Sequence, residues 1–268
     1  MPTLSARQLL RRLAAPFALS FLALTAVLIA NYVSKPVWGP SRASVEGVLL
    51  AVPFTAAITI PMAVLLSVLI VFARLRREGM LDAVRREPNG IRRLVMPVLG
   101  GAAVVTIMTF VVNSQLVPRA NERLATLSSG AAHARGDREM TIGELRAEAS
   151  KARALTSNDG AALASRYEVE IQKKFAIASA VLVLALTGVA IVFVFPRGGV
   201  FVLTAAGCTV FALYYVTLVA GESLADRLIL SPFVAMWMAN GVFLAFALFV
   251  LWSLPRRAPG LGSVSLGT

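Results

Sequence analysis

Charged side chains are scarce in this chain and unevenly spread. Asp, Glu, Lys and Arg make up 15% of its 268 residues, while 57% of the residues are hydrophobic. Six stretches contain no charged residue, and each is 22 to 28 residues long: 13–34, 47–73, 94–118, 175–196, 198–221 and 228–255. About 20 apolar residues in an α-helix cross the roughly 30 Å hydrocarbon core of a bilayer. The sequence therefore predicts an all-α membrane protein with six transmembrane helices.

Cysteine and histidine are almost absent. The single cysteine, Cys208, lies inside the fifth charge-free stretch, and the single histidine, His133, lies in a polar loop. One cysteine excludes a disulfide within the chain, and one histidine without nearby thiolates disfavours a zinc or haem site. We expect Cys208 to pack as a small apolar residue and His133 to be solvated. The sequence predicts no metal and no cofactor.

Signals for catalysis are also missing. No P-loop of the form G-x-x-x-x-G-K-[ST] occurs, so the chain cannot hydrolyse ATP by that route. A membrane-embedded lipid enzyme needs several ionisable groups at one membrane depth, and the six stretches contain no Asp, Glu or His. We therefore expect a protein that is not an enzyme.

The charge that is present is mostly basic. The chain has 26 Lys and Arg against 14 Asp and Glu, which gives a net charge of +12. Basic residues favour the short cytoplasmic flanks of transmembrane helices. Here they cluster in segments 7–12, 74–93 and 256–257 and at Arg197, which all face one side in a six-span topology. Both termini are predicted to be cytoplasmic. A basic rim beside anionic headgroups accounts for the excess without a nucleic-acid partner.

The connection between the second and third spans is polar. Residues 74–88 predict a short amphipathic helix on the cytoplasmic surface, which ends at Pro88, Asn89 and Gly90. A solvated run of charge is the alternative interpretation of the same residues.

Residues 119–174 form the only sizeable segment outside the predicted membrane region. Small polar residues at 128–137 are typical of a flexible linker. Thr141 and Glu144 form a capping box that predicts the start of a helix, and a second helix from Ala161 is expected to run into the fourth span. The chain thus divides into a transmembrane half (1–118), a small, mainly helical periplasmic segment (119–174), a second transmembrane half (175–255) and a cytoplasmic tail (256–268).

Several ordered motifs are more specific than hydropathy. They are Arg11-Arg12 with Pro16-Phe17, Pro53 and Pro61 with Arg74-Leu75, Val117-Pro118-Arg119-Ala120-Asn121, Met140-Thr141 with Glu144-Leu145, Gly198-Gly199, Tyr214-Tyr215 with Gly221, and Ser231-Pro232 with Ala235, Trp237 and Asn240. On these motifs the chain resembles the LptF/LptG (YjgP/YjgQ) permease family of the lipopolysaccharide exporter, over essentially its whole length.

This resemblance implies a six-span permease subunit in the bacterial inner membrane. Such a subunit pairs with a homologous or identical permease subunit, binds a cytoplasmic ABC-type ATPase dimer, and extracts a lipid such as lipopolysaccharide from the outer leaflet. Family members carry a periplasmic β-jellyroll of well over a hundred residues between spans three and four. Only 56 residues occupy 119–174 here, so we expect the jellyroll to be absent. A six-span scaffold or assembly protein without transport activity is the alternative.

The resemblance also indicates residues for the lipid. Lys35 follows the first span at a position where family members place basic residues against lipid phosphates. Arg42, in the same short loop, is expected to add a bidentate phosphate contact. The alternative for Lys35 is that it only extends to the interface and fixes the depth of the span.

The predicted ATPase-coupling residues lie in the cytoplasmic segment and are Arg77, Glu78, Met80, Asp82 and Arg85. Met80 stands where the family pattern has an acidic residue, and methionine cannot pair with a basic group of an ATPase. Glu78 and Asp82, two positions to either side, are the carboxylates able to replace it.

Among the polar residues in or near the predicted hydrocarbon region are three amides, Asn113, Gln115 and Asn240. Polar side chains at such depth usually bond to neighbouring helices, and we expect that role for them rather than contact with substrate.

Overall fold

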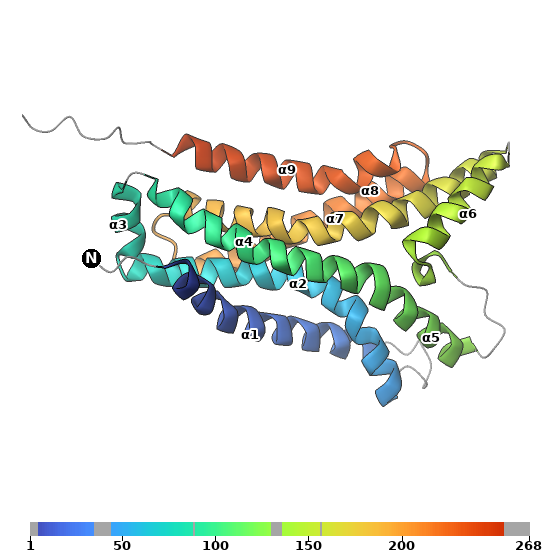
Figure 1. The fold of residues 1–268 in the computed structure, drawn as a ribbon, viewed down its shortest axis with the longest axis horizontal. Helices are drawn as coiled ribbons and strands as arrows, with labels where there is room; N and C mark the ends of the chain where they lie inside the picture. Colours follow the sequence, from blue (N-terminus) through green and yellow to red (C-terminus); the bar gives the residue numbers. More distant parts are fainter. Residues whose placement is uncertain (1–4, 35–43, 88, 130–135, 156, 255–268) are drawn as a thin grey trace, which may run out of the picture.

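The protein is described from a computed structural model that covers residues 5–34, 44–87, 89–129, 136–155 and 157–254. Its elements are α1 (Ala6–Val33), α2 (Val45–Arg77), α3 (Met80–Arg86), α4 (Gly90–Val111), the π-helical η3 (Val112–Leu116), α5 (Val117–Ser129), the short 3-10 turn η4 (Asp137–Glu139), α6 (Ile142–Ala154), α7 (Asn158–Val194), α8 (Val200–Asp226) and α9 (Pro232–Ser253). Every regular element in these ranges is helical, which confirms the all-α prediction (Figure 1).

Six helical segments are long and apolar enough to cross a membrane, as predicted. They are α1, α2, the continuous run from α4 through η3 into α5, α7, α8 and α9. Several helices extend beyond the charge-free stretches. For example, α1 already begins at Ala6, because Ser5 and Gln8 form a capping box around Arg7 and ahead of Arg11 and Arg12.

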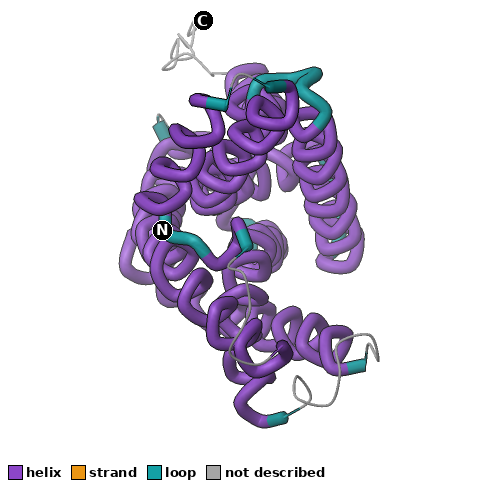
Figure 2. The backbone as a smooth tube through the Cα atoms, turned by 90° about the vertical axis from the view of Figure 1, so that its right-hand side faces the viewer, coloured by secondary structure: helices purple, strands orange, loops and turns teal. Residues whose placement is uncertain are grey.

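The centre of the bundle consists of α2 and α7, which are mostly buried and pack against each other. Figure 1 shows α1 and α9 on opposite sides of this pair. The two ends of the bundle differ. One end carries α3, the start of α1 and the end of α9, and we call it the α3 end; the other carries α5, α6 and the start of α7, and we call it the α6 end. Viewed from the α6 end, the described residues form only helices and the loops and turns that join them (Figure 2).

The main hydrophobic core joins α2 to α7 with fully buried side chains such as Leu65, Leu69, Phe72 and Leu184. Arg76 ties the same two helices together at the α3 end. Its guanidinium donates a 2.6 Å hydrogen bond to the carbonyl oxygen of Phe195 and a second bond to that of Val192. A cation at a helix C-terminus is favourable because the last carbonyls carry partial negative charge.

The cytoplasmic helix predicted over residues 74–88 is divided in the structure. Residues 74–77 form the last turn of α2, and α3 covers only Met80–Arg86. The break falls at Gly79, whose φ of 70° is a left-handed conformation that glycine adopts without strain. Because the chain turns here, α3 leaves the axis of α2 and crosses the α3 end of the bundle (Figure 1).

The α6 end contains a helical hairpin that extends the bundle. Thr141 caps α6 and Glu144 completes the capping box, as predicted. α6 then packs along the first part of α7, a single helix of 37 residues that continues into the core. The described residues between α4 and α7 contain no strand, so the expected absence of a β-jellyroll agrees with this part of the chain.

Candidate functional site

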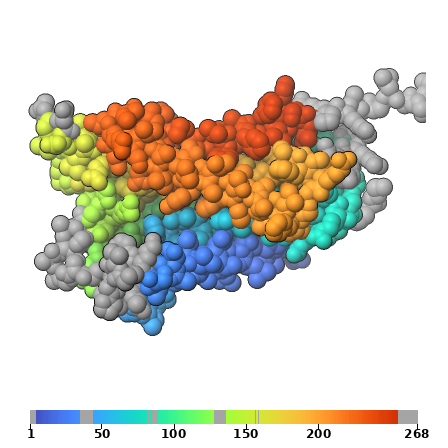
Figure 3. Space-filling model, turned by 180° about the vertical axis from the view of Figure 1, so that it is seen from behind, coloured from blue at the N-terminus to red at the C-terminus, as the bar shows by residue number. Residues whose placement is uncertain are grey.

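A cavity of about 150 Å³ lies in the half of the bundle nearer the α6 end. Its wall is built mainly from α2, α7 and α8, with η3, α5 and η4 closing one end. The lining residues are Phe54, Ala57, Ile58, Pro61, Asn113, Val117, Asn121, Arg138, Glu170, Lys173, Lys174, Ile177, Ala180, Phe211, Tyr214, Tyr215, Leu218, Val219 and Glu222. Seen from behind, α8 and α1 lie on either side of exposed atoms of α2 (Figure 3).

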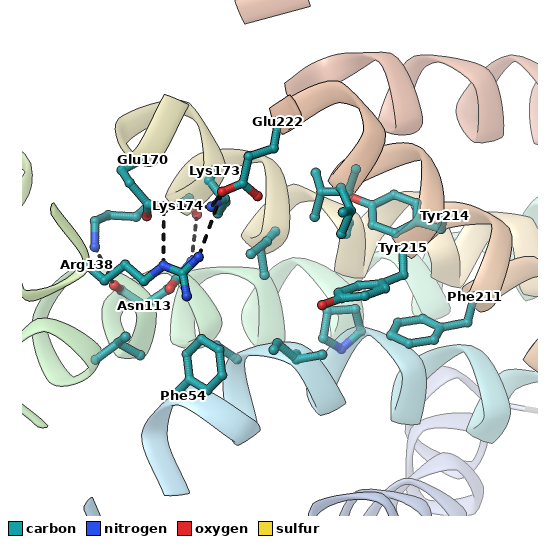
Figure 4. A pocket seen from close by; sticks show the side chains of 18 of the residues that line it. Phe54, Asn113, Arg138, Glu170, Lys173, Lys174, Phe211, Tyr214, Tyr215 and Glu222 are labelled. Carbon is teal, nitrogen blue, oxygen red and sulfur yellow. Dashed lines mark hydrogen bonds and ion pairs between the residues drawn. The ribbon is translucent and has the colours of Figure 1, made fainter. Parts of the chain in front are cut away.

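The cavity is polar at one end and apolar along the rest. Figure 4 shows Arg138, Glu170, Lys173 and Glu222 gathered at one end, and the rings of Phe211 and Tyr215 at the other. This division follows the sequence of α7, because Lys174 is its last charged residue before a stretch of 22 uncharged residues, 175–196. The polar end therefore lies where α7 enters the apolar part of the bundle.

Lys173 is the centre of the charged cluster. Its ammonium donates 2.6 Å hydrogen bonds to Oε1 of Glu170 on its own helix and to Oε1 of Glu222 on α8. Arg138 approaches the same two carboxylates at longer range, 3.9 Å from Glu170 and 4.0 Å from Glu222. Glu170 is only 7% exposed, so its charge depends on these cations for stabilisation. The cluster joins η4, α7 and α8 at the α6 end.

Lys174, the next residue of α7, also lines the cavity and is 3% exposed. Its ammonium donates a long hydrogen bond of 3.4 Å to the backbone oxygen of Asn113, and the Asn113 amide donates one of 3.3 Å to the backbone oxygen of Lys174. Asn113 lies in η3, the π-helical segment between α4 and α5. Such segments leave backbone carbonyls displaced from the regular ladder and are frequent at functional sites.

Asn121 connects the segment outside the bundle to this site. Its amide donates a 3.2 Å hydrogen bond to the backbone oxygen of Arg138. Asn121 belongs to the Val-Pro-Arg-Ala-Asn motif of the sequence, so this motif helps to fix η4 and, with it, the guanidinium of Arg138 over the cavity.

Two of the three amides considered in the sequence analysis, Asn113 and Asn240, bond to neighbouring helices. Asn113 pairs with Lys174, and Asn240 donates to the backbone oxygen of Ala176 and accepts a 3.0 Å hydrogen bond from Tyr214. Gln115 is exposed. The expectation of interhelical bonding therefore holds for the two asparagines, although Asn113 also lines the cavity.

The predicted coupling residues lie at the α3 end, far from the cavity. Arg77 is exposed in the last turn of α2, and Glu78 follows it and pairs with Arg12 of α1 at 2.6 Å. Met80 is half-buried and packs against the main core, so its apolar side chain has a structural role in seating α3. Asp82 and Arg85 belong to α3, and their side chains lie outside the described part of the structure.

The predicted lipid contacts Lys35 and Arg42 lie outside the described residues. In their place the structure identifies five charged residues that the sequence analysis missed: Arg138, Glu170, Lys173, Lys174 and Glu222. Glu222, near the end of α8, is half-buried and accepts a hydrogen bond from Lys173. The available signal was the position of Lys173-Lys174 immediately before one charge-free stretch and of Glu222 immediately after another.

Comparison with known proteins agrees with the motifs and the fold. The family model for the lipopolysaccharide export system permease LptF/LptG matches residues 7–135 and 128–253. No curated protein matches the chain. The two matched segments overlap at 128–135 and together cover all six long apolar helices apart from the first residue of α1. The chain is a member of the LptF/LptG family, the membrane permeases of the lipopolysaccharide export system.

Proposed function

We propose that this chain is a permease subunit of an ATP-driven lipid exporter and that it extracts a lipopolysaccharide-like lipid from the inner membrane with energy from a separate ATPase. The observation that carries this proposal is the family match, which spans the bundle from α1 to α9. The cavity supports it, because an apolar wall with a charged rim suits a molecule that has acyl chains and a polar headgroup.

The α3 end is proposed to face the cytoplasm. Exposed arginines gather there, among them Arg74, Arg77, Arg93 and Arg197, and short basic flanks favour the cytoplasmic side. In this orientation both termini are cytoplasmic, α6 lies in the periplasm, and the cavity opens toward the outer leaflet. Lipid in the outer leaflet would then meet the charged rim at headgroup depth.

A second permease subunit, homologous or identical, is proposed to complete the lipid path. α1 and α8 lie on either side of the exposed part of α2, and both present large apolar side chains to their surroundings, including Leu19 and Leu22 on α1 and Leu213 and Val216 on α8. These faces suit either acyl chains or a neighbouring subunit. Lys35 and Arg42, which follow α1 in the sequence, are proposed to bind lipid phosphate at the same membrane surface.

The first experiment tests whether α3 binds the ATPase. Asp82 in α3 is changed to Lys, and the ATPase that co-purifies from mild detergent is quantified. Asp226→Lys is the matched control, because Asp226 is exposed at the α6 end and the change in charge is the same. We expect Asp82→Lys to reduce the recovered ATPase about tenfold, as for loss of one charged contact at an interface, and Asp226→Lys to leave it unchanged. Equal recovery from all three forms would contradict docking at α3.

The second experiment tests the lipid contact at Lys35. A photoreactive phosphorylated lipid is reconstituted with the chain, and crosslinking to α1 is compared between the wild type and Lys35→Glu. The reversed charge should repel phosphate and reduce crosslinking. Unchanged crosslinking would assign Lys35 to fixing the depth of the span, and absence of both an ATPase partner and a lipid crosslink would favour the scaffold alternative.

A further inference from the structure

We infer that η4, the turn Asp137–Glu139, is a lid over the polar end of the cavity, and that the Arg138 side chain holds this lid closed in the structure. Such a lid would control access to the cavity from the α6 end. The proposed function does not specify this property, and the property requires neither an ATPase nor a particular lipid.

η4 connects two walls of the cavity. On one side, the Asn121 amide of α5 donates a 3.2 Å hydrogen bond to the backbone oxygen of Arg138. On the other side, the Arg138 guanidinium extends toward Glu170 of α7 and Glu222 of α8 (Figure 4). Both Asn121 and Arg138 line the cavity. The turn therefore spans the polar end between α5 and the α7–α8 pair.

The contacts within the wall are short, whereas those between the wall and the Arg138 side chain are long. Lys173 joins α7 to α8 through a 2.6 Å ion pair with Glu222, and the two side chains are 15% and 25% exposed. The Arg138 guanidinium lies 3.9 Å from Glu170 and 4.0 Å from Glu222, and its side chain is 63% exposed. Attraction between charges weakens with distance and with access of water. Of these two connections, the one through Arg138 is therefore the one that opens first.

Opening of the lid would leave no net charge on the wall behind it. The polar end of the wall carries two lysines and two carboxylates on α7 and α8. η4 adds one charge of each sign to this cluster: Arg138 approaches the carboxylates, and Asp137 acts electrostatically on Lys174, as does Glu170. Uncompensated buried charge is costly. Because the wall is balanced with or without η4, movement of the turn avoids that cost.

η4 can move as one unit, because four hydrogen bonds lie within the turn and its flanking residues. The backbone N–H of Glu139 donates to the carbonyl oxygen of Gly136 at 3.1 Å, and that of Met140 donates to the carbonyl oxygen of Asp137 at 3.4 Å. The Glu139 carboxylate accepts the N–H of Gly136 at 3.0 Å, and Oδ1 of Asp137 accepts the N–H of Arg138 at 2.8 Å. None of these bonds has to break when the Arg138 side chain leaves the cavity.

The experiment measures access of a charged reagent to the cavity. The full chain in lipid nanodiscs carries Ile177→Cys in a Cys208→Ser background, and 2-sulfonatoethyl methanethiosulfonate modifies the new thiol. Ile177 lines the cavity, and a sulfonate does not cross hydrocarbon, so the rate of modification reports entry from the polar end. Each rate is divided by that of Arg227→Cys, because Arg227 is exposed at the same end of the bundle.

Arg138→Met and Arg138→Lys are compared, because both keep an unbranched stem over the cavity and only lysine keeps the charge. We expect Arg138→Met to raise the rate about fivefold, which corresponds to about 1 kcal/mol, the upper value for exposed ion pairs. Arg138→Lys should keep the slow rate of the wild type. Higher ionic strength should accelerate the wild type and Arg138→Lys but not Arg138→Met, because salt screens exposed ion pairs.

Two controls separate opening of the lid from loss of folding. Arg146→Met removes an exposed arginine of α6 that does not line the cavity, and it should leave the rate unchanged. Leu184→Cys, used in place of Ile177→Cys, puts the thiol in the fully buried core. This thiol should stay unreactive when Arg138 is changed to Met, whereas loss of folding would expose it.

Equal rates in Arg138→Met and Arg138→Lys would overturn the inference, because the charge at this position would then not hold the turn. A rate in the wild type that does not change with salt would contradict it as well. Absence of modification of Ile177→Cys in every form would mean that the polar end does not open. None of these outcomes depends on an ATPase, so the proposed function is decided separately by the co-purification experiment at Asp82.

Discussion

Arg12 and Glu78 are 66 positions apart in the sequence, and their side chains form an ion pair of 2.6 Å at the α3 end of the bundle. Arg12 lies in the second turn of α1, and Glu78 is the C-cap residue directly after α2. The pair therefore connects the first transmembrane helix to the turn that precedes α3. Glu78 was predicted to contact an ATPase, and in the structure its carboxylate binds within the chain.

Exchange of these two charges tests the pair. Both side chains are more than 40% exposed, and exposed ion pairs stabilise proteins by less than about 1 kcal/mol. We expect Arg12→Glu and Glu78→Arg each to lower the free energy of unfolding by about that amount, and the double exchange to restore it. Thermal unfolding in detergent measures all three. If the double variant is no more stable than the single ones, the pair does not form in the membrane protein.

Close packing of α8 on α9 depends on Gly221. A Cβ atom at this position would lie 2.3 Å from the backbone oxygen of Ala235, and the backbone cannot move aside as a flexible side chain can. Gly221→Ala should lower the free energy of unfolding by about 1–3 kcal/mol, the usual cost of overpacking. Gly241→Ala is the control, because a Cβ there meets no described atom within 4 Å and alanine favours the helix. Similar melting temperatures for both variants would refute the close approach.

The bond network of Asn240 is expected to stabilise three helices. Asn240 in α9 is 3% exposed and binds both the backbone of α7 at Ala176 and the hydroxyl of Tyr214 in α8. Asn240→Ala should cost about 1–2 kcal/mol of unfolding free energy, because interhelical bonds in membranes contribute about this much and their partners would be left unpaired. Tyr214→Phe, which breaks one bond only, should cost less. Thr217→Val is the control, since Thr217 is half-buried and its hydroxyl bonds within its own helix, to the carbonyl oxygen of Leu213. If Thr217→Val lowers the free energy of unfolding as much as Asn240→Ala does, the interhelical bonds of Asn240 do not contribute more than a bond within one helix.

The orientation in the membrane can be tested with two exposed arginines. Arg197 lies in the turn between α7 and α8 at the α3 end, and Arg227 lies in the turn between α8 and α9 at the α6 end. In a Cys208→Ser background, Arg227→Cys should react with a membrane-impermeant maleimide added to cells with a permeabilised outer membrane. Arg197→Cys should react only after lysis. The reverse pattern would place α3 in the periplasm and exclude a cytoplasmic ATPase as its partner.

Much of the fold is predictable from the sequence because single segments carry the signal. Helix length in a bilayer depends on uncharged residues in a row, so the six charge-free stretches predict six spans. Helix caps can also be predicted, because they depend on residues close together in the sequence, as the capping box of Thr141 and Glu144 shows. The boundaries are less predictable. Arginines are tolerated inside helix ends, and for this reason α1 begins at Ala6 rather than near residue 13.

The candidate site is less predictable because its partners are distant in the sequence. Lys173 and Glu222 are 49 positions apart, and Asn113 and Lys174 are 61 positions apart. Each residue alone resembles an ordinary charge or amide at a helix end. The division of residues 74–88 into the end of α2 and a short α3 likewise depends on packing, since Met80 and Leu81 are held against the core.

The sequence by itself determined that the chain is an all-helical membrane protein of six long helices, and its motifs indicated the family. Both follow from local order: runs of uncharged residues and residues at fixed spacing. Only the tertiary structure decided that Arg138, Glu170, Lys173, Lys174 and Glu222 line one cavity. The reason is physical: electrostatic interactions depend on distances in space, and a chain folded into six long helices brings together charges whose separation along the sequence carries no information about those distances.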